Sequence, residues 1–567
     1  MLFFTDSSKS LIWIIAFVCI AYFFRGCFEL EITEKLSTLC FVLSVFFSLL
    51  IFLGSQLAEY ERLEFLYLPY KSMQQIFLPF SRLSYLIFLI YVLLAKILSS
   101  ALNTKQCTAV CEPEGNTNYV LLFLACTAII IICWLPYYIA FYPGVISEDS
   151  LSEVLQQLGK EPLSNHHPII HQFFIGLCLK AADTLTAGVG LFSIVQMLFL
   201  ASAFSAVIVF LKKQGVKRLV LCAVLVVYAL YPVNAFFSIT MWKDVPFAAT
   251  SVFLCILLLN ETDEKGKKGF LRAVLFVAAA FGFCTFRNNG FYAFVFGMVL
   301  IIVFNRTNRK RLALLSIITV CAVVGYQHVL FDTLGFAKSN ISEALSVPIQ
   351  QVARVVNIDG IDDGDENIAV LREVFPDLEQ TAENYTPTFA DPVKGNPKRG
   401  YALFDAEVFS NEPVRYIKSW AGLGLEHPVN YIEAFLLQSY GYWYPDINEN
   451  IVGSYIIGND LGLKSTESFE TLKSALFLNS EAFIRHQPTA ILGSIGFLVW
   501  VMLICAVLLC LKGHGHTASV LFCMLGLWLT TLLSPVYCEY RYIYGLIAVV
   551  PLFAAITYSK ENKRGSF

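Results

Sequence analysis

The feature that most constrains this chain is a series of apolar segments long enough to cross a membrane. A helix rises 1.5 Å per residue, so roughly 17 to 25 apolar residues cover about 30 Å of hydrocarbon. With 57% hydrophobic and 15% charged residues among 567, the chain has too little polar surface for a soluble multidomain protein. We therefore expect an all-α polytopic membrane protein with about 13 transmembrane helices. The expected spans are residues 11–24, 39–55, 81–102, 119–141, 187–211, 219–236, 243–260, 270–286, 290–304, 312–330, 487–511, 516–535 and 541–558.

The basic residues predict which loops face the cytoplasm. Lys and Arg gather in every second loop from residue 212 onward, at 212–218, 261–269, 305–311 and 559–564. Because cytoplasmic loops carry an excess of these residues, the alternate loops are expected on the extracytoplasmic face of a cell membrane. Those alternate loops are 240–247, 286–291, 331–486 and 537–545. The stretch 331–486 is the one long polar region, and we expect it to form a mixed, mainly helical extracytoplasmic domain.

The stretch FYPGVISEDSLSEVLQQLGKEPLSNHHPIIH, residues 141–171, interrupts the apolar pattern. Leu151, Val154 and Leu158 share a face at helical spacing, which predicts a short amphipathic helix. Ser150 and Glu153 have the spacing of a capping box at its start. The apolar segment that follows, from residue 167, is interpreted as an interfacial or re-entrant helix and not as a further span, with 142–167 extracytoplasmic.

The order of several motifs resembles the GT-C superfamily of polytopic membrane glycosyltransferases. The motifs are YPGVISEDS, HHP, WKDVPF, RNNG, SVPIQQVARV and EYRYIYGLIAVVPL, from about residue 119 to the C-terminus. They are most similar to a bacterial group of uncharacterised multi-span proteins related to GT-C enzymes. In the superfamily, the first large external loop carries an acidic residue just past a transmembrane helix. Here the acidic motif follows the fourth expected span, which indicates an added N-terminal module.

This resemblance implies four regions. They are an N-terminal transmembrane module (1–118), a GT-C-like core (119–330) with its catalytic loop at 142–186, the extracytoplasmic domain (331–486) and the C-terminal transmembrane helices (487–567). It also implies a polyprenyl-phosphate-linked sugar donor and a cell-envelope glycan, polymer or protein as acceptor, with membrane lipids as surroundings. The formal net charge of −3 gives no reason to expect nucleic acid as a partner.

Sugar transfer from such a donor needs a base for the acceptor proton and cations for the departing phosphate. Asp149 is the expected catalytic base and Glu148 the alternate, with a pKa raised by desolvation beside the membrane. Both acids also suit the N-terminus of a helix, where they complement its dipole. The expected substrate-binding residues are His167, His171, Lys243, Arg287, Asn288, Gln350, Gln351 and Arg541.

Three alternatives stay open at this point. His167 and His171 are four residues apart and, with Asp149, offer a site for a divalent cation such as Mg or Mn, although no metal ligand is assigned. Lys243 is followed by Asp244, which would neutralise it. A transporter or flippase of envelope lipids or polysaccharide precursors, or a non-catalytic envelope assembly protein, are the alternative functions; the lack of internal repeats disfavours a transporter.

Overall fold

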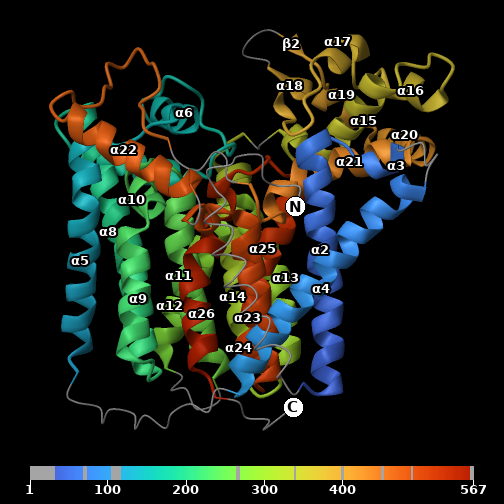
Figure 1. The fold of residues 1–567 in the computed structure, drawn as a ribbon. Helices are drawn as coiled ribbons and strands as arrows, with labels where there is room; N and C mark the ends of the chain where they lie inside the picture. Colours follow the sequence, from blue (N-terminus) through green and yellow to red (C-terminus); the bar gives the residue numbers. More distant parts are fainter. Residues whose placement is uncertain are drawn as a thin grey trace. The chain divides into compact units, whose positions relative to one another are not determined.

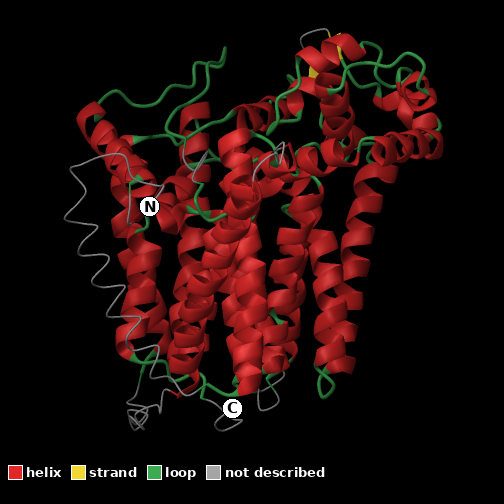
Figure 2. Ribbon diagram, turned by 45° about the vertical axis from the view of Figure 1, so that its right-hand side comes forward, coloured by secondary structure: helices red, strands yellow, loops and turns green. Residues whose placement is uncertain are grey.

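The computed structural model describes residues 32–67, 73–103, 117–263, 269–337, 340–396, 401–447, 453–486 and 489–561. The chain divides into two compact units. One holds residues 1–110 with 511–513 and 561–567, and the other holds residues 111–510 and 514–560. Figure 2 shows that helix accounts for most of the described chain, the strands being a pair of two-residue segments at Gly395–Asn396 and Tyr401–Ala402.

The smaller unit contains two long helices. These are α2 (Glu34–Tyr60) and α4 (Met73–Asn103), with the four-residue α3 (Glu64–Tyr67) between them in the chain. Thr33 caps α2 by accepting a hydrogen bond from the amide of Leu36. The two long helices pack against each other, and the hydroxyls of Ser37 and Tyr91 lie 2.9 Å apart across the contact.

The larger unit contains the remaining apolar helices. They are α5 (Tyr119–Ala140), α8 (Leu185–Lys213), α9 (Arg218–Leu230), α10 (Pro232–Ile239), α11 (Asp244–Thr262), α12 (Phe270–Thr285), α13 (Asn288–Phe304), α14 (Arg309–His328), α23 (Ile495–Leu511), α24 (Gly515–Ser519), α25 (Leu521–Leu533) and α26 (Tyr544–Ser559). Figure 1 shows most of them running side by side as a bundle. Most of their side chains are apolar because each must match either lipid or a neighbouring helix.

Among the described residues, eight helices are long and apolar enough to cross a membrane, or up to nine if a bent pair counts as one span. These eight include α2 and α4 of the smaller unit. The chain is therefore a multi-pass membrane protein. The expected spans 270–286, 290–304 and 487–511 correspond to shorter apolar helices, α12, α13 and α23. The first expected span, 11–24, lies outside the described residues, so the expected number of about 13 stays a prediction.

Helices α8, α11 and α26 lie in the interior of the larger unit, and most residues of their apolar segments are buried. In α5 and α14, by contrast, most residues of these segments are not buried. Close approach of α13 and α25 depends on a glycine. A Cβ added at Gly297 would lie 2.6 Å from the Cα of Cys523, so any larger residue would force the two helices apart. Small residues serve this purpose at helix contacts in membranes.

The expected span 219–236 is broken in the structure. Helix α9 ends at Leu230, α10 begins at Pro232, and the two axes differ by 49°. Proline lacks an amide hydrogen and clashes with the preceding turn, which explains the bend. Asn234 donates a hydrogen bond to the carbonyl of Tyr228 at 3.2 Å, which satisfies a carbonyl that the break leaves without a helical partner.

Three short helices lie at one end of this bundle: α6 (Glu148–Gln157), α7 (Ile169–Lys180) and α22 (Glu470–Arg485). Figure 1 shows α6 and α22 beyond the ends of α5, α8 and α10. Helix α7 has 12 residues and is about 18 Å long, too short to cross a bilayer alone. It packs against α6 and α8, in agreement with the interpretation that this segment is not a further span.

A second group of helices forms what we call the helical subdomain, residues 341–439. Its helices are α15 (Ser346–Ile358), α16 (Glu366–Leu371), α17 (Leu378–Glu383), α18 (Asp391–Lys394), α19 (Ala406–Asn411), α20 (Pro413–Glu426) and α21 (Pro428–Ser439). They enclose an apolar core of their own that includes Val352, Phe375 and Leu423. Within that core, Arg354 of α15 pairs with Glu433 of α21.

Candidate functional site

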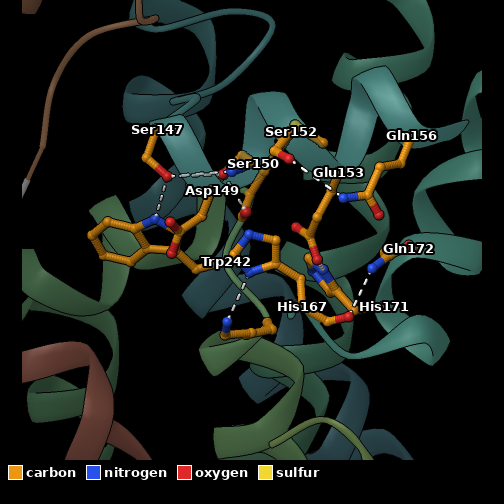
Figure 3. Close-up of polar contacts among 12 residues, drawn as sticks. Ser147, Asp149, Ser150, Ser152, Glu153, Gln156, His167, His171, Gln172 and Trp242 are labelled. Atoms are coloured by element: carbon orange, nitrogen blue, oxygen red, sulfur yellow. Dashed lines mark hydrogen bonds and ion pairs between the residues drawn. The ribbon is translucent and has the colours of Figure 1, made fainter. Parts of the chain in front are cut away.

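The loop from α5 to α6 fixes the first turn of α6 against the segment before α11. Val145 forms backbone hydrogen bonds with Ile239 at 2.9 Å and Met241 at 3.1 Å. Ser147, the residue before the helix, is its N-cap and also accepts a hydrogen bond from the Trp242 indole at 2.9 Å. Figure 3 shows these contacts holding the start of α6 beside Trp242.

The expected capping box at Ser150 and Glu153 is wrong, because the helix begins three residues earlier than that spacing predicts. Ser150 lies inside the first turn and its hydroxyl donates to the carbonyl of Met241 at 2.6 Å. Glu153 is buried and faces His171. The side chains of Ser150 and Glu153 therefore bind residues outside α6 and do not cap it. Glu148 and Asp149 are the first two residues of α6, near the positive end of its dipole.

Asp149 forms the central ion pair of the site. Its carboxylate accepts a hydrogen bond of 2.8 Å from the guanidinium of Arg541, 392 residues away in the chain. The side chain of Asp149 is 35% exposed and that of Arg541 16%. Glu539 lies 3.3 Å from the same guanidinium, so one arginine is shared by two carboxylates. The pair is reachable from outside the bundle.

Two aromatic rings frame Arg541. Its guanidinium carbon lies 5.0 Å from the centre of the Trp242 ring and 5.3 Å from that of Tyr542. Contacts of this kind orient an arginine through its attraction to the ring faces. The two rings therefore fix the orientation of Arg541, which in turn binds Asp149.

The pKa of Asp149 departs from the expected direction. Burial alone raises it, but the charges of Arg541 and Lys243 outweigh burial and hold the pKa of Asp149 well below its usual range. The expectation of a raised pKa is thus wrong for this structure, because it considered desolvation without the cations. The pKa of the neighbouring Glu539 carboxyl is raised instead, mainly by burial.

Lys243 and His167 form a second polar contact at the site. The ammonium of Lys243 donates to His167 Nδ1 at 3.0 Å (Figure 3), so the imidazole is neutral and its proton sits on Nε2. Burial and the charge of Lys243 lower the pKa of His167 to about 2. His167 therefore positions the lysine, whose charge also acts on Asp149.

Arg287 pairs with Asp244 at 2.5 Å, and both side chains are buried. The guanidinium also lies 4.5 Å from the centre of the Tyr542 ring. The expected neutralisation of Lys243 by Asp244 is wrong, because Arg287 takes that carboxylate. Arg287 lies in the same cluster as Arg541 through the shared ring of Tyr542, but its burial makes it a support for the site and not a ready ligand for phosphate.

The other expected site residues lie elsewhere. His171 is fully buried and its Nδ1 lies 2.9 Å from Glu153 Oε1, which ties α7 to α6. Gln350 and Gln351 lie within the helical subdomain, where they donate to the carbonyls of Thr386 and Tyr431. Asn288 and Glu148 are exposed at the first positions of their helices. The structure thus gathers Asp149, His167, Lys243, Arg287 and Arg541 and leaves the other five outside the cluster.

Within the described part of the chain, no group of three or more His, Cys, Asp or Glu side chains is arranged to hold a metal ion. His167 faces Lys243, and His171 faces Glu153, so the two histidines do not converge with Asp149. Arg541 and Lys243 provide positive charge beside Asp149. The divalent cation, Mg or Mn, stays a prediction without a ligand set among these residues.

The sequence predictions missed two aromatic residues of the site, Trp242 and Tyr542. Each adjoins a residue that was singled out: Trp242 precedes Lys243, and Tyr542 follows Arg541. An aromatic residue next to a cation at the end of a span was the available signal. It is ambiguous because Trp and Tyr are common at membrane interfaces in any case.

Comparison with known proteins gives one family match. A family model described as a family of unknown function (DUF6020) matches residues 159–566, which is most of the chain. The matched stretch begins after Asp149 and contains His167, Lys243, Arg287 and Arg541. No curated protein matches the chain. No solved structure matches it.

Proposed function

The chain belongs to the DUF6020 family, whose function is unknown, and we propose that it is a membrane glycosyltransferase. It moves a sugar from a polyprenyl-phosphate-linked donor to a hydroxyl of a cell-envelope acceptor, on the extracytoplasmic face, with Asp149 as base. Two observations support the proposal: the motifs of the chain resemble those of GT-C enzymes, and a charged site lies at the end of the helix bundle. Glu148 is set aside as the base because it lies at the exposed first position of α6, outside the charged cluster.

The observation that carries the proposal is the Asp149–Arg541 pair with Lys243 beside it. A carboxylate and two cations lie together at a partly exposed position in the first turn of α6. A lipid-linked phosphate requires this combination, because its chain stays in the membrane while its charged group lies at the surface. The helix-dipole explanation accounts for an acid at this position but not for the two cations.

The reaction balances with these residues alone. The acceptor hydroxyl oxygen forms a bond to the anomeric carbon while the bond from that carbon to the phosphate oxygen breaks. The hydroxyl proton passes to Asp149, and the bonding electrons leave with the polyprenyl phosphate. Arg541 and Lys243 stabilise the negative charge that builds on the departing phosphate.

The low pKa of Asp149 sets the order of events. While Arg541 is bound to it, the carboxylate is a weak base. A donor phosphate competes for the guanidinium, whose fork suits phosphate oxygens, and loss of the ion pair raises the basicity of Asp149. Donor binding therefore activates the base, and a site without donor does not deprotonate the acceptor.

The test is a transfer assay with the purified full chain. The protein is incubated with polyprenyl-phosphate sugars and envelope acceptors, and release of polyprenyl phosphate is followed. Acceptor-dependent release by the unaltered protein, absent in Asp149→Asn, is the expected result. Glu148→Gln is the matched control, since it removes the neighbouring carboxylate and should keep activity. Release that is undiminished in a folded Asp149→Asn variant contradicts the assignment of the base.

The extracytoplasmic position of the site has its own test. Lys160, exposed just beyond α6, and Lys310, exposed in the first turn of α14, are each replaced by cysteine in a background cleared of interfering native cysteines. A membrane-impermeant thiol reagent added outside intact cells should label the cysteine at 160 and not the one at 310. The opposite pattern would place the site on the cytoplasmic side.

A further inference from the structure

Helices α20 and α21 of the helical subdomain carry an exposed apolar surface. Val414, Ile417 and Leu425 lie at i, i+3 and i+11 on one face of α20, and Leu425 is 85% exposed. Val429 and Ile432 of α21 are also exposed. Contiguous apolar surface of this kind marks a contact with another apolar phase or partner. Lys418 is exposed between Val414 and Leu425, as expected of an interfacial helix whose lysine reaches toward phosphate headgroups.

Two hydrogen bonds join the turn that follows α21 to the helix bundle of the larger unit. The indole of Trp500 donates to the carbonyl of Trp443, and that of Trp528 donates to the carbonyl of Tyr442, both at 3.0 Å. Trp500 is the sixth residue of α23, and Trp528 lies five residues before the end of α25. The turn after α21 therefore lies beside the first two turns of α23 and the last two turns of α25.

The occupant of the exposed surface follows from that position. Figure 1 shows α20 and α21 along the edge of the helical subdomain nearest the apolar helices of the larger unit. Helix α21 ends at Ser439, three residues before Tyr442, so the apolar residues of α20 and α21 precede a turn that lies beside the ends of two apolar helices. The bilayer surface itself is the partner that this position and composition fit.

Behind α20 lies a cavity of about 200 Å³. Its walls are apolar or aromatic and include Val352 of α15, Phe375, and Trp420 of α20. Ile417 both lines the cavity and is 47% exposed, so it forms the rim between the cavity and the lipid-facing surface. Walls of this composition offer no hydrogen bond to water and suit a hydrocarbon chain.

We propose that α20 and α21 lie in the membrane surface and that the cavity behind α20 binds the end of one hydrocarbon chain of a membrane phospholipid or polyprenyl phosphate. The exposed face brings lipid to the rim at Ile417, and the apolar walls hold the chain. This site is separate from the Asp149 cluster, and it does not depend on the proposed sugar transfer.

The test is photocrosslinking of the full chain in phosphatidylglycerol vesicles. One arm contains a phosphatidylglycerol with a diazirine at the end of one acyl chain, and the other a polyprenyl phosphate with a diazirine at its chain end. Adducts mapped by mass spectrometry are expected on the cavity wall, in the peptides that carry Val352 and Trp420. If adducts form in one arm only, that lipid is the one whose chain enters the cavity. If they form in both arms, the cavity accepts a hydrocarbon chain from either lipid.

Two variants separate the cavity from the exposed surface. Val352→Trp fills the cavity and should lower the wall adducts at least fivefold, whereas Val303→Trp adds the same bulk at an exposed position of α13, outside the helical subdomain, and should leave them unchanged. Ile349→Phe, a smaller filling change, replaces Val352→Trp if that variant does not fold. Absence of adducts on the cavity wall in both arms, already in the unaltered protein, overturns the proposal, as does undiminished labelling in a folded cavity-filling variant.

Discussion

Two pairs of arginine and carboxylate in this molecule differ chiefly in exposure. Arg354 and Glu433 join α15 to α21, with side chains 4% and 0% exposed, and Arg354 also donates to the hydroxyl of Tyr385. Arg541 and Asp149 join the C-terminal region to α6, with side chains 16% and 35% exposed. A buried pair has no route to exchange its partner, whereas an accessible one can release the arginine to an anion. This difference in exposure is why we propose a functional role for the second pair and a structural role for the first.

The largest expected effect separates the two pairs by activity. Asp149→Asn removes the proposed base and should lower transfer by about 100- to 10,000-fold, the range for loss of general-base catalysis. Thermal unfolding in detergent should change little, because the pair is partly exposed. A large loss of melting temperature in Asp149→Asn would show that this pair too is mainly structural.

Breaking the buried pair should affect stability instead. Glu433→Gln leaves Arg354 buried without a charged partner, and loss of one member of a buried pair costs about 3–5 kcal/mol. A clearly lowered melting temperature is expected, with transfer activity per folded molecule near that of the unaltered protein. Unchanged stability would mean that Tyr385 and the remaining contacts suffice for Arg354.

Replacing the shared arginine should have a smaller effect on activity. Arg541→Lys keeps the charge but loses the fork, and a hydrogen bond to a charged group is worth roughly 1.5–3 kcal/mol, or about a 10- to 100-fold lower transfer rate. Arg372→Lys alters an exposed pair with Asp363 and is the control, with no expected change. Equal rates for Arg541→Lys and the unaltered protein would remove Arg541 from the proposed phosphate site.

The smallest effect concerns pH. Because the pKa of His167 is lower in the folded chain, at about 2, than the usual 6.5 in the unfolded chain, the unfolded chain binds the proton first as pH falls. Stability should therefore decline below about pH 6.5, by about 2 kcal/mol at pH 5 from this residue. The His167→Gln variant keeps an acceptor for Lys243. Its melting temperature should fall less between pH 7.5 and pH 5 than that of the unaltered protein. If the melting temperatures of the two proteins fell equally, titratable groups other than His167 would cause the decline in stability.

Local sequence patterns predicted the helices well because membrane thickness imposes a length on each apolar segment. The described helices α5, α8 and α12 begin and end within two residues of the expected spans. The cap of α6 was misplaced because Ser150 and Glu153 have partners at Met241 and His171, which no local pattern encodes. Likewise, the pKa of Asp149 depends on a residue 392 positions away.

The sequence predicted which residues lie together in the candidate site better than it predicted which of them contact one another. Alternation of basic loops indicated that Asp149, Lys243, Arg287 and Arg541 share one end of the bundle, and the structure brings them together there. Which cation meets which carboxylate could not be predicted, because several residues of each sign lie at the ends of adjacent helices. Gln350 and Gln351 lie apart from this cluster, since a polar pair on a helix fits a buried hydrogen-bonded position as well as a binding surface.

The most direct test of the central claim is acceptor-dependent release of polyprenyl phosphate, measured with the purified full chain and with Asp149→Asn beside Glu148→Gln. The account predicts release by the unaltered protein and by Glu148→Gln, and none above background by a folded Asp149→Asn. Equal release by Asp149→Asn and the unaltered protein would contradict it.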